Sequence, residues 1–210
     1  MKQIKLSKAS LLSWKTVIAL ALVVVVVAAL TIYPFRILNM LSTSKSTSDM
    51  QAIATPAMKQ TFVKLAAAHT DVCRDLGDKA AIESYMNSLP NNARLQGSCC
   101  NPMVLNKFVS QIKGLKQYSG IPQIPKDPYD VSAASAKQML GYYDSIYLTN
   151  AQQSTYNSAK SKTDDQGWCC CQCWAWYTHA GLAKYLISEH NFTTQQVIAV
   201  TNLEDCCGGV

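Results

Sequence analysis

The most prominent feature of the hydrophobic pattern is one apolar run near the start of the chain. Residues 17–35 are nineteen residues without a charged side chain, and at ~1.5 Å rise per residue a helix of that length crosses a ~30 Å hydrocarbon core. Four lysines and no acidic residue precede the run, which favours a cytoplasmic N-terminus. A cleaved signal peptide is the alternative, but the Ala-x-Ala sequence at 52–54 lies about twenty residues too late for it. The pattern therefore predicts a cytoplasmic basic tail at 1–16 and a transmembrane signal anchor at 17–35.

A polar, aperiodic stretch follows the apolar run. Residues 36–53 are rich in serine and threonine, which is typical of a flexible tether. The remaining residues, 54–210, are enough for one domain with its own core and too few for two. We therefore expect a single extracytoplasmic domain at 54–210.

Helical periodicity dominates that domain. Thr55 followed by Pro56 is the pattern of an N-cap and a first-turn proline, and Thr149 and Thr193 each stand three residues before a glutamine, as in a capping box. Three prolines interrupt residues 120–130, which predicts an extended connection there. Helices are expected at 55–73, 78–89, 101–115, 132–148, 150–161, 173–190 and 193–203. Because strand patterns are nearly absent, the predicted fold class is all-α, with an N-terminal transmembrane helix followed by a cysteine-rich helical bundle.

The charge distribution argues against a nucleic-acid partner. The formal net charge is +6, but residues 1–36 hold five of the nineteen basic residues and none of the thirteen acidic ones. Basic and acidic residues nearly balance in the rest of the chain, and no lysine or arginine stripe appears there. The positive charge therefore indicates membrane topology instead.

Nine cysteines, all downstream of the apolar run, supply the candidate chemistry. Cys73 stands alone, and the other eight, which are the candidate metal ligands, form three clusters: Cys99 and Cys100; Cys169, Cys170, Cys171 and Cys173; Cys206 and Cys207. Crowded thiols can bind a soft metal, form disulfides or exchange with other disulfides. Adjacent cysteines do not easily bridge to each other, which favours metal binding over a disulfide scaffold, with thiol redox exchange third.

The clusters are predicted to lie at helix ends. Cys99 and Cys100 directly precede the expected helix start at Asn101, where free N–H groups and the helix dipole favour thiolate. If a helix began at Cys169, then Cys169 and Cys173 would share a face at i, i+4. Because helix ends can gather at one pole of a bundle, we predict that the three clusters converge on one site.

The residue types limit the choice of metal to soft ions. Sulfur-rich sites suit Cu(I) or Zn(II), and Met103 could add a thioether, although a core position explains it as well. His69 and Cys73 are spaced i, i+4, but their helical face is otherwise apolar, which favours a core histidine. His179 and His190 would lie ~16 Å apart along one helix and cannot share an ion. No C-x-x-C-H sequence occurs, so covalent haem is not expected.

Catalytic patterns are weak in this chain. A nucleophilic pair could be formed by Cys100 or Cys173 with His179, but no protease-like signature surrounds these residues. The C-x-x-C of residues 170–173 lacks the strands of a thioredoxin-like domain. No catalytic residue is therefore predicted.

The arrangement of Cys99 and Cys100, and of WCCCQC at 168–173 before a helix, resembles the PCYCGC-motif proteins, which are membrane-anchored bacterial surface proteins. The resemblance implies an envelope location and metal binding. The residues after Cys100 depart from the family's motif, and Cys206 and Cys207 have no counterpart in it, so no residue role is transferred. Together these observations predict a single-pass membrane protein of the cell envelope whose outer domain binds copper or zinc. The alternative is a disulfide-stabilised domain that acts through an envelope protein partner.

Overall fold

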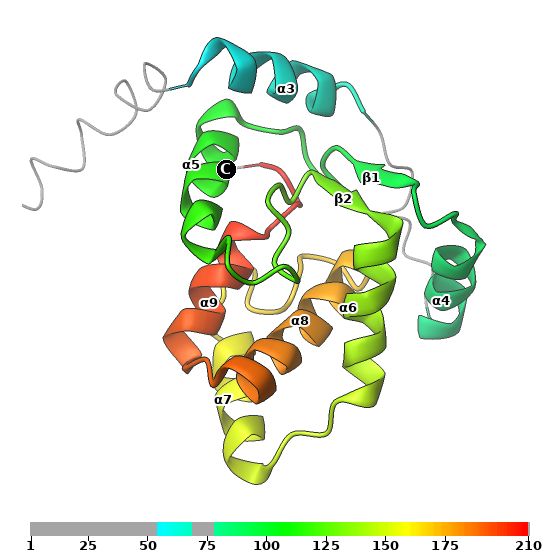
Figure 1. Ribbon diagram of the computed structural model, residues 1–210, viewed down its shortest axis with the longest axis vertical. Coiled ribbons are helices and arrows are strands. Elements are labelled where there is room, and N and C mark those ends of the chain that lie inside the picture. The colour runs from blue at the N-terminus through cyan, green and yellow to red at the C-terminus, as the bar shows by residue number, and fades with distance from the viewer. Residues whose placement is uncertain (1–53, 69–77, 210) are drawn as a thin grey trace, which may run out of the picture. The chain divides into compact units, whose positions relative to one another are not determined.

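Seven α-helices and one short sheet make up the part of the chain that the computed structural model describes, residues 54–68 and 78–209 (Figure 1). The helices are α3 (Pro56–Ala66), α4 (Lys79–Ser88), α5 (Leu105–Leu115), α6 (Ala133–Ser145), α7 (Asn150–Lys160), α8 (Trp174–His190) and α9 (Thr194–Leu203), with a 3-10 turn, η1 (Lys116–Tyr118), after α5. The strands β1 (Arg94–Gln96) and β2 (Asp130–Ser132) pair antiparallel.

Local sequence determines where most of these helices begin. The Thr55 side chain accepts the Met58 N–H, and Pro56 opens α3. Thr149 and Thr193 each complete a capping box with the glutamine three residues later, at the starts of α7 and α9. Each such cap satisfies backbone N–H groups that would otherwise lack a partner. These predicted starts are confirmed.

The prediction differs from the structure beside two of the cysteine clusters. The helix expected from Asn101 begins only at Leu105, because the residues before it pair with another segment of the chain. Residues 169–172 are not helical, and α8 begins at Trp174 with Cys173 as its N-cap. The i, i+4 relation considered for Cys169 and Cys173 is therefore wrong.

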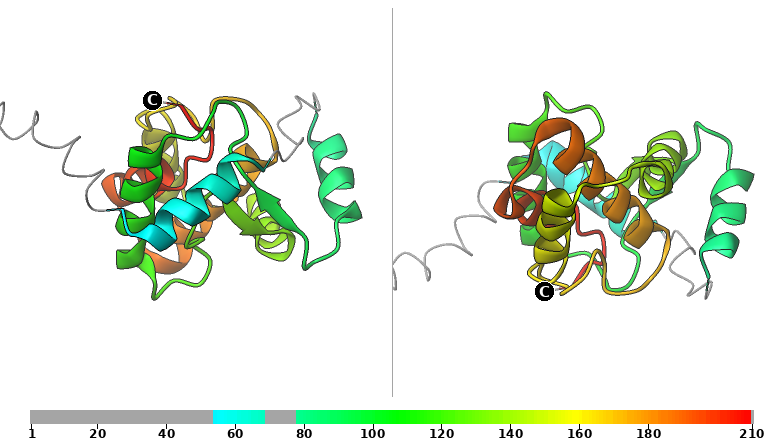
Figure 2. Two further views of the ribbon diagram at one scale, coloured as in Figure 1. Left: turned by 90° about the horizontal axis from the view of Figure 1, so that it is seen from above. Right: turned by 90° about the horizontal axis from the view of Figure 1, so that it is seen from below.

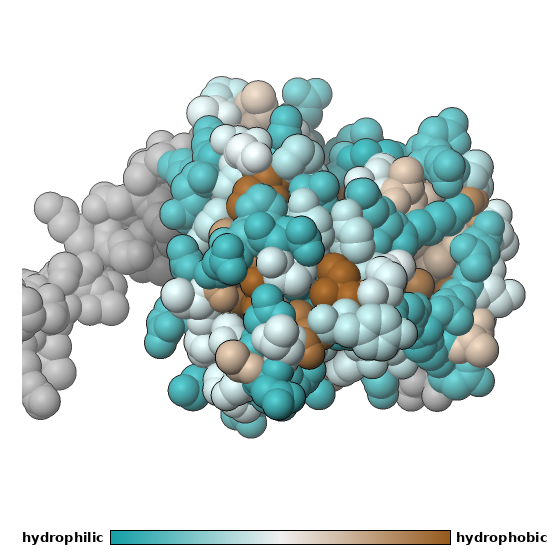
Figure 3. Space-filling view, turned by 60° about the horizontal axis from the view of Figure 1, so that its bottom comes forward, coloured by the Kyte–Doolittle hydropathy of each residue, from teal (hydrophilic) through white to brown (hydrophobic). Residues whose placement is uncertain are grey.

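Helix α8 is the centre of the fold. It contacts α6, α7 and α9 (Figures 1 and 2), and eleven of its residues are buried, so it has no continuous polar face. Its crossing with α6 is close because Gly181 has no side chain: a Cβ there would lie 1.8 Å from the Met139 carbonyl oxygen. On the outside, Figure 3 shows a mostly hydrophilic face with small, separate hydrophobic patches.

The sheet joins the beginning and the middle of the domain. Leu95 pairs with Val131, and both are buried. The Arg94 Nε donates to Asp130 Oδ1 at 2.7 Å. Strand β1 ends three residues before Cys99, so the sheet fixes the approach of the first cysteine cluster to the core.

The predicted fold class is wrong. The described residues include a two-stranded sheet, which three-residue strands are too short to reveal through alternation. No helix in 54–68 or 78–209 is both long and apolar enough to cross a membrane. The predicted span at 17–35, the tail at 1–16 and the tether at 36–53 lie outside the described residues.

A buried carboxyl group ends α9. Glu204 is 2% exposed, and its Oε1 atom has no hydrogen-bond partner in the described part of the chain. Burial, and to a smaller extent the Asp127 carboxylate, raises the pKa of Glu204 well above its usual range. Burial also raises the pKa of Asp127 to about 6. The folded state therefore holds the Glu204 proton at pH values where the unfolded chain has released it.

This proton makes the free energy of unfolding depend on pH. Stability due to protonated Glu204 is fully present below the unfolded pKa of ~4.3 and is lost as pH rises through the higher folded pKa. We expect Glu204→Gln to gain stability relative to the unsubstituted protein by about 1.4 kcal/mol per pH unit in that window. Urea unfolding at several pH values between 5 and 8 measures this difference.

The exposed residue Glu189 provides the control. Glu189→Gln removes one carboxylate from the surface and so measures the effect of losing a negative charge without changing the core. The interpretation of Glu204 would be contradicted if Glu204→Gln gave a difference in unfolding free energy that stayed constant across the range.

Candidate metal centre

The sulfur atoms of the three cysteine clusters lie together. The Cys207 Sγ lies 3.0 Å from that of Cys169 and 3.8 Å from that of Cys99. The Cys100 Sγ lies 2.9 Å from that of Cys170. The predicted convergence of the clusters is thus confirmed, whereas their role as metal ligands stays a prediction.

The remaining thiols extend this group from the interior to the surface. The Cys206 Sγ lies 3.8 Å from Cys99 Sγ, and the Cys171 Sγ lies 3.6 Å from Cys100 Sγ. Cys173, at the start of α8, hydrogen-bonds with Cys169. Four of the eight are buried, namely Cys169, Cys173, Cys206 and Cys207. Cys99 and Cys171 are half-buried, and Cys100 and Cys170 are exposed. One continuous thiol cluster, defined as these eight residues, therefore reaches from the core to solvent.

Backbone pairing places two of the clusters side by side. The Cys99 N–H donates to the Cys206 carbonyl at 2.9 Å, and the Asn101 N–H donates to the Cys207 carbonyl at 2.8 Å. The chain makes this approach at Gly208, whose φ is +70°, a conformation that glycine adopts without strain. The segments 99–102 and 206–209 therefore form one structural unit.

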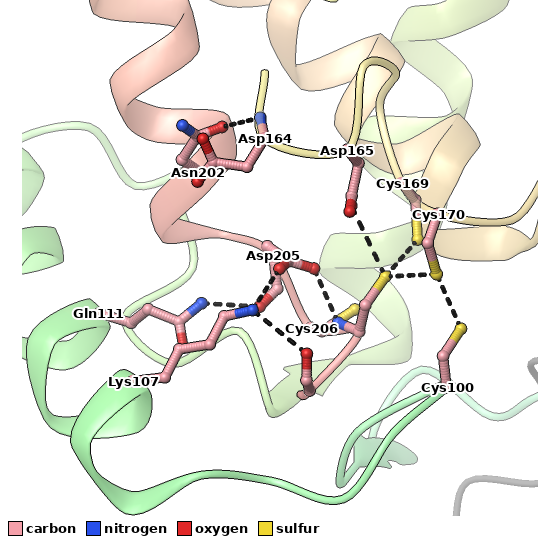
Figure 4. Close-up of polar contacts among 12 residues, drawn as sticks. Cys100, Lys107, Gln111, Asp164, Asp165, Cys169, Cys170, Asn202, Asp205 and Cys206 are labelled. Carbon is pink, nitrogen blue, oxygen red and sulfur yellow. Dashed lines mark hydrogen bonds and ion pairs between the residues drawn. The ribbon is translucent and has the colours of Figure 1, made fainter. Parts of the chain in front are cut away.

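A chain of partly buried polar side chains holds the segment 206–209 in place. The Asp205 Oδ1 accepts the Cys207 N–H at 2.8 Å, and its Oδ2 accepts Lys107 Nζ at 2.7 Å. Gln111 Nε2 donates to the Asp205 carbonyl at 2.7 Å and its Oε1 accepts the Tyr129 hydroxyl at 2.9 Å. Figure 4 shows Lys107 and Gln111 reaching from α5 to Asp205. Helix α5 thus orients the Cys207 backbone, as outer groups orient ligands in metal sites.

A turn at the end of α7 positions the middle cluster. The Gly167 N–H donates to the Thr163 hydroxyl oxygen at 3.1 Å. The Trp168 carbonyl lies 2.7 Å from His179 Nδ1 on α8, and both residues are buried. His179 therefore serves to hold the loop that carries residues 169–173.

Hydrogen bonds between thiols divide the cluster into donors and acceptors. Hydrogen bonds from Cys169 and then Cys171 lower the pKa of Cys173, with help from the Trp176 backbone N–H in the first turn of α8. Hydrogen bonds with Cys169 and then Cys99 lower the pKa of Cys207. These hydrogen bonds favour the thiolate forms of Cys173 and Cys207.

Other thiols of the cluster show the opposite shift. The pKa of Cys99 is raised by hydrogen bonds, first with Cys169 and then with Cys173. The hydrogen bond with Cys99 favours the Cys206 thiolate, but burial and the negative charge of Cys207 outweigh it and raise the pKa of Cys206. Burial raises the pKa of Cys170. Full ionisation of the cluster thus needs a cation to balance the charge.

A cavity gives access to the outer edge of the cluster. This cavity has a volume of ≈ 780 Å³ and is lined by Cys170, Cys207, Asp165, Asp205 and Lys107 among others. Burial, and then the neighbouring Asp205 carboxylate, raises the pKa of Asp165 to about 6. Figure 4 shows the Asp165 side chain beside those of Cys169 and Cys170. A small cation could therefore reach the thiols past two carboxyl groups.

The other residues considered from sequence have different positions. Met103 is buried in the hydrophobic core, whereas His69 and Cys73 lie outside the described residues. The sequence analysis missed Lys107 and Asp205. A local signal existed for Asp205, because an aspartate two residues before an N–H donor commonly accepts it in an Asx-turn. Nothing local marked Lys107, which lies 98 positions away from Asp205.

The cluster contains groups of three sulfur atoms that lie close enough together to bind one soft ion. In each of three triads the sulfur atoms all lie within 4.8 Å of one another: Cys99, Cys169 and Cys207; Cys100, Cys170 and Cys207; Cys169, Cys170 and Cys171. A fourth triad replaces two sulfurs by the carboxylates of Asp165 and Asp205 beside Cys207. Three sulfurs around one ion at ~2.3 Å would be about 4 Å apart. The cysteine clusters could therefore hold a metal ion.

Comparison of the chain with protein-family models, curated proteins and solved structures finds no match. The resemblance to the PCYCGC-motif proteins therefore stays a prediction, and the functional argument has to come from the site itself.

Proposed function

We propose that this protein binds a soft metal ion, Cu(I) or Zn(II), through thiolates of the cluster. The observation that carries the proposal is the triad of Cys99, Cys169 and Cys207, which takes one sulfur from each of three distant segments and brings all three within 4.8 Å. Thiolate sulfur selects soft ions over calcium or magnesium. The polar chain that orients Cys207 supplies the outer support that such sites require.

The charge state of the cluster also supports a bound cation. Cys173 and Cys207 have lowered pKa values although both are buried. A buried thiolate is costly without a counter-charge. The Lys107 ammonium, which lines the same cavity as Cys207, already pairs with Asp205 at 2.7 Å. A metal cation is the counter-charge that fits between sulfurs.

Elemental analysis combined with thiol counting tests this function. Protein purified without chelator should contain at least one equivalent of copper or zinc. The reactive thiols should be few in the folded protein, and should increase when a strong chelator removes the metal. Alkylation followed by mass measurement under non-reducing conditions counts them. Protein that contains no metal and four disulfides would contradict the proposal.

A disulfide-stabilised domain that acts through protein contacts is the second candidate. The specific observation in its favour is that the Cys100 and Cys170 sulfurs, both exposed, lie 2.9 Å apart. Cys207 lies equally close to Cys170, at 2.9 Å, and to Cys169, at 3.0 Å. Since a cysteine forms only one disulfide, this overlap suits shared metal ligation better than a fixed set of bridges. The same alkylation experiment would identify the pairs.

A further inference from the structure

Cys207 belongs to three of the four groups of possible metal ligands among the described residues, more than any other cysteine. It belongs both to the triad with Cys99 and Cys169 and to the triad with Cys100 and Cys170. Its sulfur lies 2.9 to 3.8 Å from the nearest sulfurs of both groups. Two triads of sulfur atoms therefore share one sulfur, that of Cys207.

One metal ion cannot use all of these thiols. A mononuclear thiolate site takes three or four sulfurs, whereas eight lie in this continuous cluster. Leaving several thiols unused beside a bound ion would also keep them free to oxidise. A thiolate, however, has more than one lone pair and can bind two soft ions at once. The Cys207 sulfur, which both triads share, is where such a bridge would form.

The size of the groups favours Cu(I) over Zn(II) for a shared site. Each group of sulfurs within 4.8 Å has three members among the described residues, and three-coordination is common for Cu(I) but leaves a structural zinc site incomplete. Two three-coordinate ions that share one sulfur need five cysteines. The two triads joined at Cys207 contain five: Cys99, Cys100, Cys169, Cys170 and Cys207.

We propose that the cluster holds at least two Cu(I) ions, joined by the Cys207 thiolate as a bridging ligand. This inference rests on the proposed metal-binding function and adds the number of ions and the residue that links them. One ion takes the inner triad, which includes buried Cys169, and the other takes the outer triad, which includes exposed Cys100 and Cys170. Seating the two ions requires three pairs of sulfurs to separate by about 1 Å: Cys170–Cys207 and Cys100–Cys170, each now at 2.9 Å, and Cys169–Cys207, now at 3.0 Å. Cys169 and Cys170 lie in a non-helical loop and can make this change.

The buried and exposed ends of the cluster then have different roles. The cavity opens at Cys170 and Cys207, so an ion enters at the outer triad. Transfer inward needs no free ion, because Cys207 stays bound while Cys100 and Cys170 are exchanged for Cys99 and Cys169. The bridge thus explains why one thiol is common to both groups.

Anaerobic titration of the reduced full-length protein with Cu(I), against a chromophoric Cu(I) chelator, tests the inference. We expect at least two equivalents to bind, with metal–metal scattering in the X-ray absorption spectrum and the ultraviolet-excited emission of a shielded Cu(I)–thiolate cluster. Cys207→Ser should lose the scattering and the emission, and should bind at least one equivalent less. Ser98→Ala, which changes the loop just before Cys99 but leaves every sulfur in place, should keep two equivalents and the scattering.

The outcomes separate the two proposals. Binding of a single equivalent, or of two without metal–metal scattering, overturns the bridge but leaves metal binding intact. Absence of any Cu(I) or Zn(II) binding overturns the proposed function itself. If Cys207→Ser retains the scattering of the unsubstituted protein, Cys207 is not the bridge. Circular dichroism of both variants establishes whether a loss reflects unfolding, and the stoichiometry of the unsubstituted protein decides the number of ions without any variant.

Discussion

Replacing Cys99 by serine should lower the affinity for a soft metal at least a hundredfold. Cys99 is the sulfur that connects the first cluster to the last, with Cys206 and Cys207 both 3.8 Å away. Its thiol also hydrogen-bonds with Cys169 and Cys173. Serine offers a hard, protonated oxygen that soft ions bind poorly. Changes to outer-shell groups alone typically cost 10- to 100-fold, so loss of a direct ligand should cost more.

Competition with a chromophoric chelator measures this affinity, and a neighbouring residue provides the control. Ser98→Ala changes the same loop but leaves every sulfur in place, so its affinity should match that of the unsubstituted protein. A loss of less than tenfold for Cys99→Ser would show that Cys99 is not a ligand. The far-ultraviolet circular dichroism of both variants should remain helical.

Replacing Gly208 by alanine should destabilise the fold by about 2–5 kcal/mol and weaken metal binding at the same time. A Cβ at this position would lie 2.0 Å from the Asn101 carbonyl oxygen, and relieving such overpacking typically costs about 1–3 kcal/mol. The φ of +70° adds strain of about 1–2 kcal/mol for a residue with a side chain. The segments 99–102 and 206–209 would separate, and with them the sulfurs of Cys99 and Cys207.

Gly120→Ala is the matched control, because nothing lies within 4 Å of a Cβ there. Urea unfolding should show the loss of stability only for Gly208→Ala, and metal competition should show weaker binding for the same variant. Unchanged metal affinity in a destabilised Gly208→Ala would mean that the pairing of the two segments supports the fold but not the site.

The sequence was informative where structure depends on neighbouring residues. The caps at Thr55, Thr149 and Thr193 are local interactions, and the helices they begin start where the pattern predicts, although the first ends at Ala66 and not at 73 as expected. The start of α5 at Leu105 was missed because Asn101 hydrogen-bonds with Cys207, far along the chain. No local pattern contains that information.

The same distinction applies to the site. Clustered cysteines could be recognised directly, and their convergence followed from placing them near helix ends. The dipole argument holds for Cys173, which caps α8, but not for Cys99 and Cys100, which lie before Leu105 in non-helical chain. Those two are positioned by strand β1 and by backbone pairing, and so the right convergence was predicted partly for a wrong reason.

The spacing of the cysteines along the chain has a consequence for how the domain folds. The triad of Cys169, Cys170 and Cys171 comes from consecutive residues, whereas the Cys99–Cys207 and Cys100–Cys170 contacts close loops of 108 and 70 positions. The entropy of closing these loops differs by only about 0.4 kcal/mol, so neither has a clear priority. If the cluster binds metal as proposed, the local triad can capture an ion before either loop closes, and the ion would then act as a template on which the distant segments assemble. An unfolded chain that binds metal in this way would make added metal stabilise the native state by less than the affinity of the complete site implies.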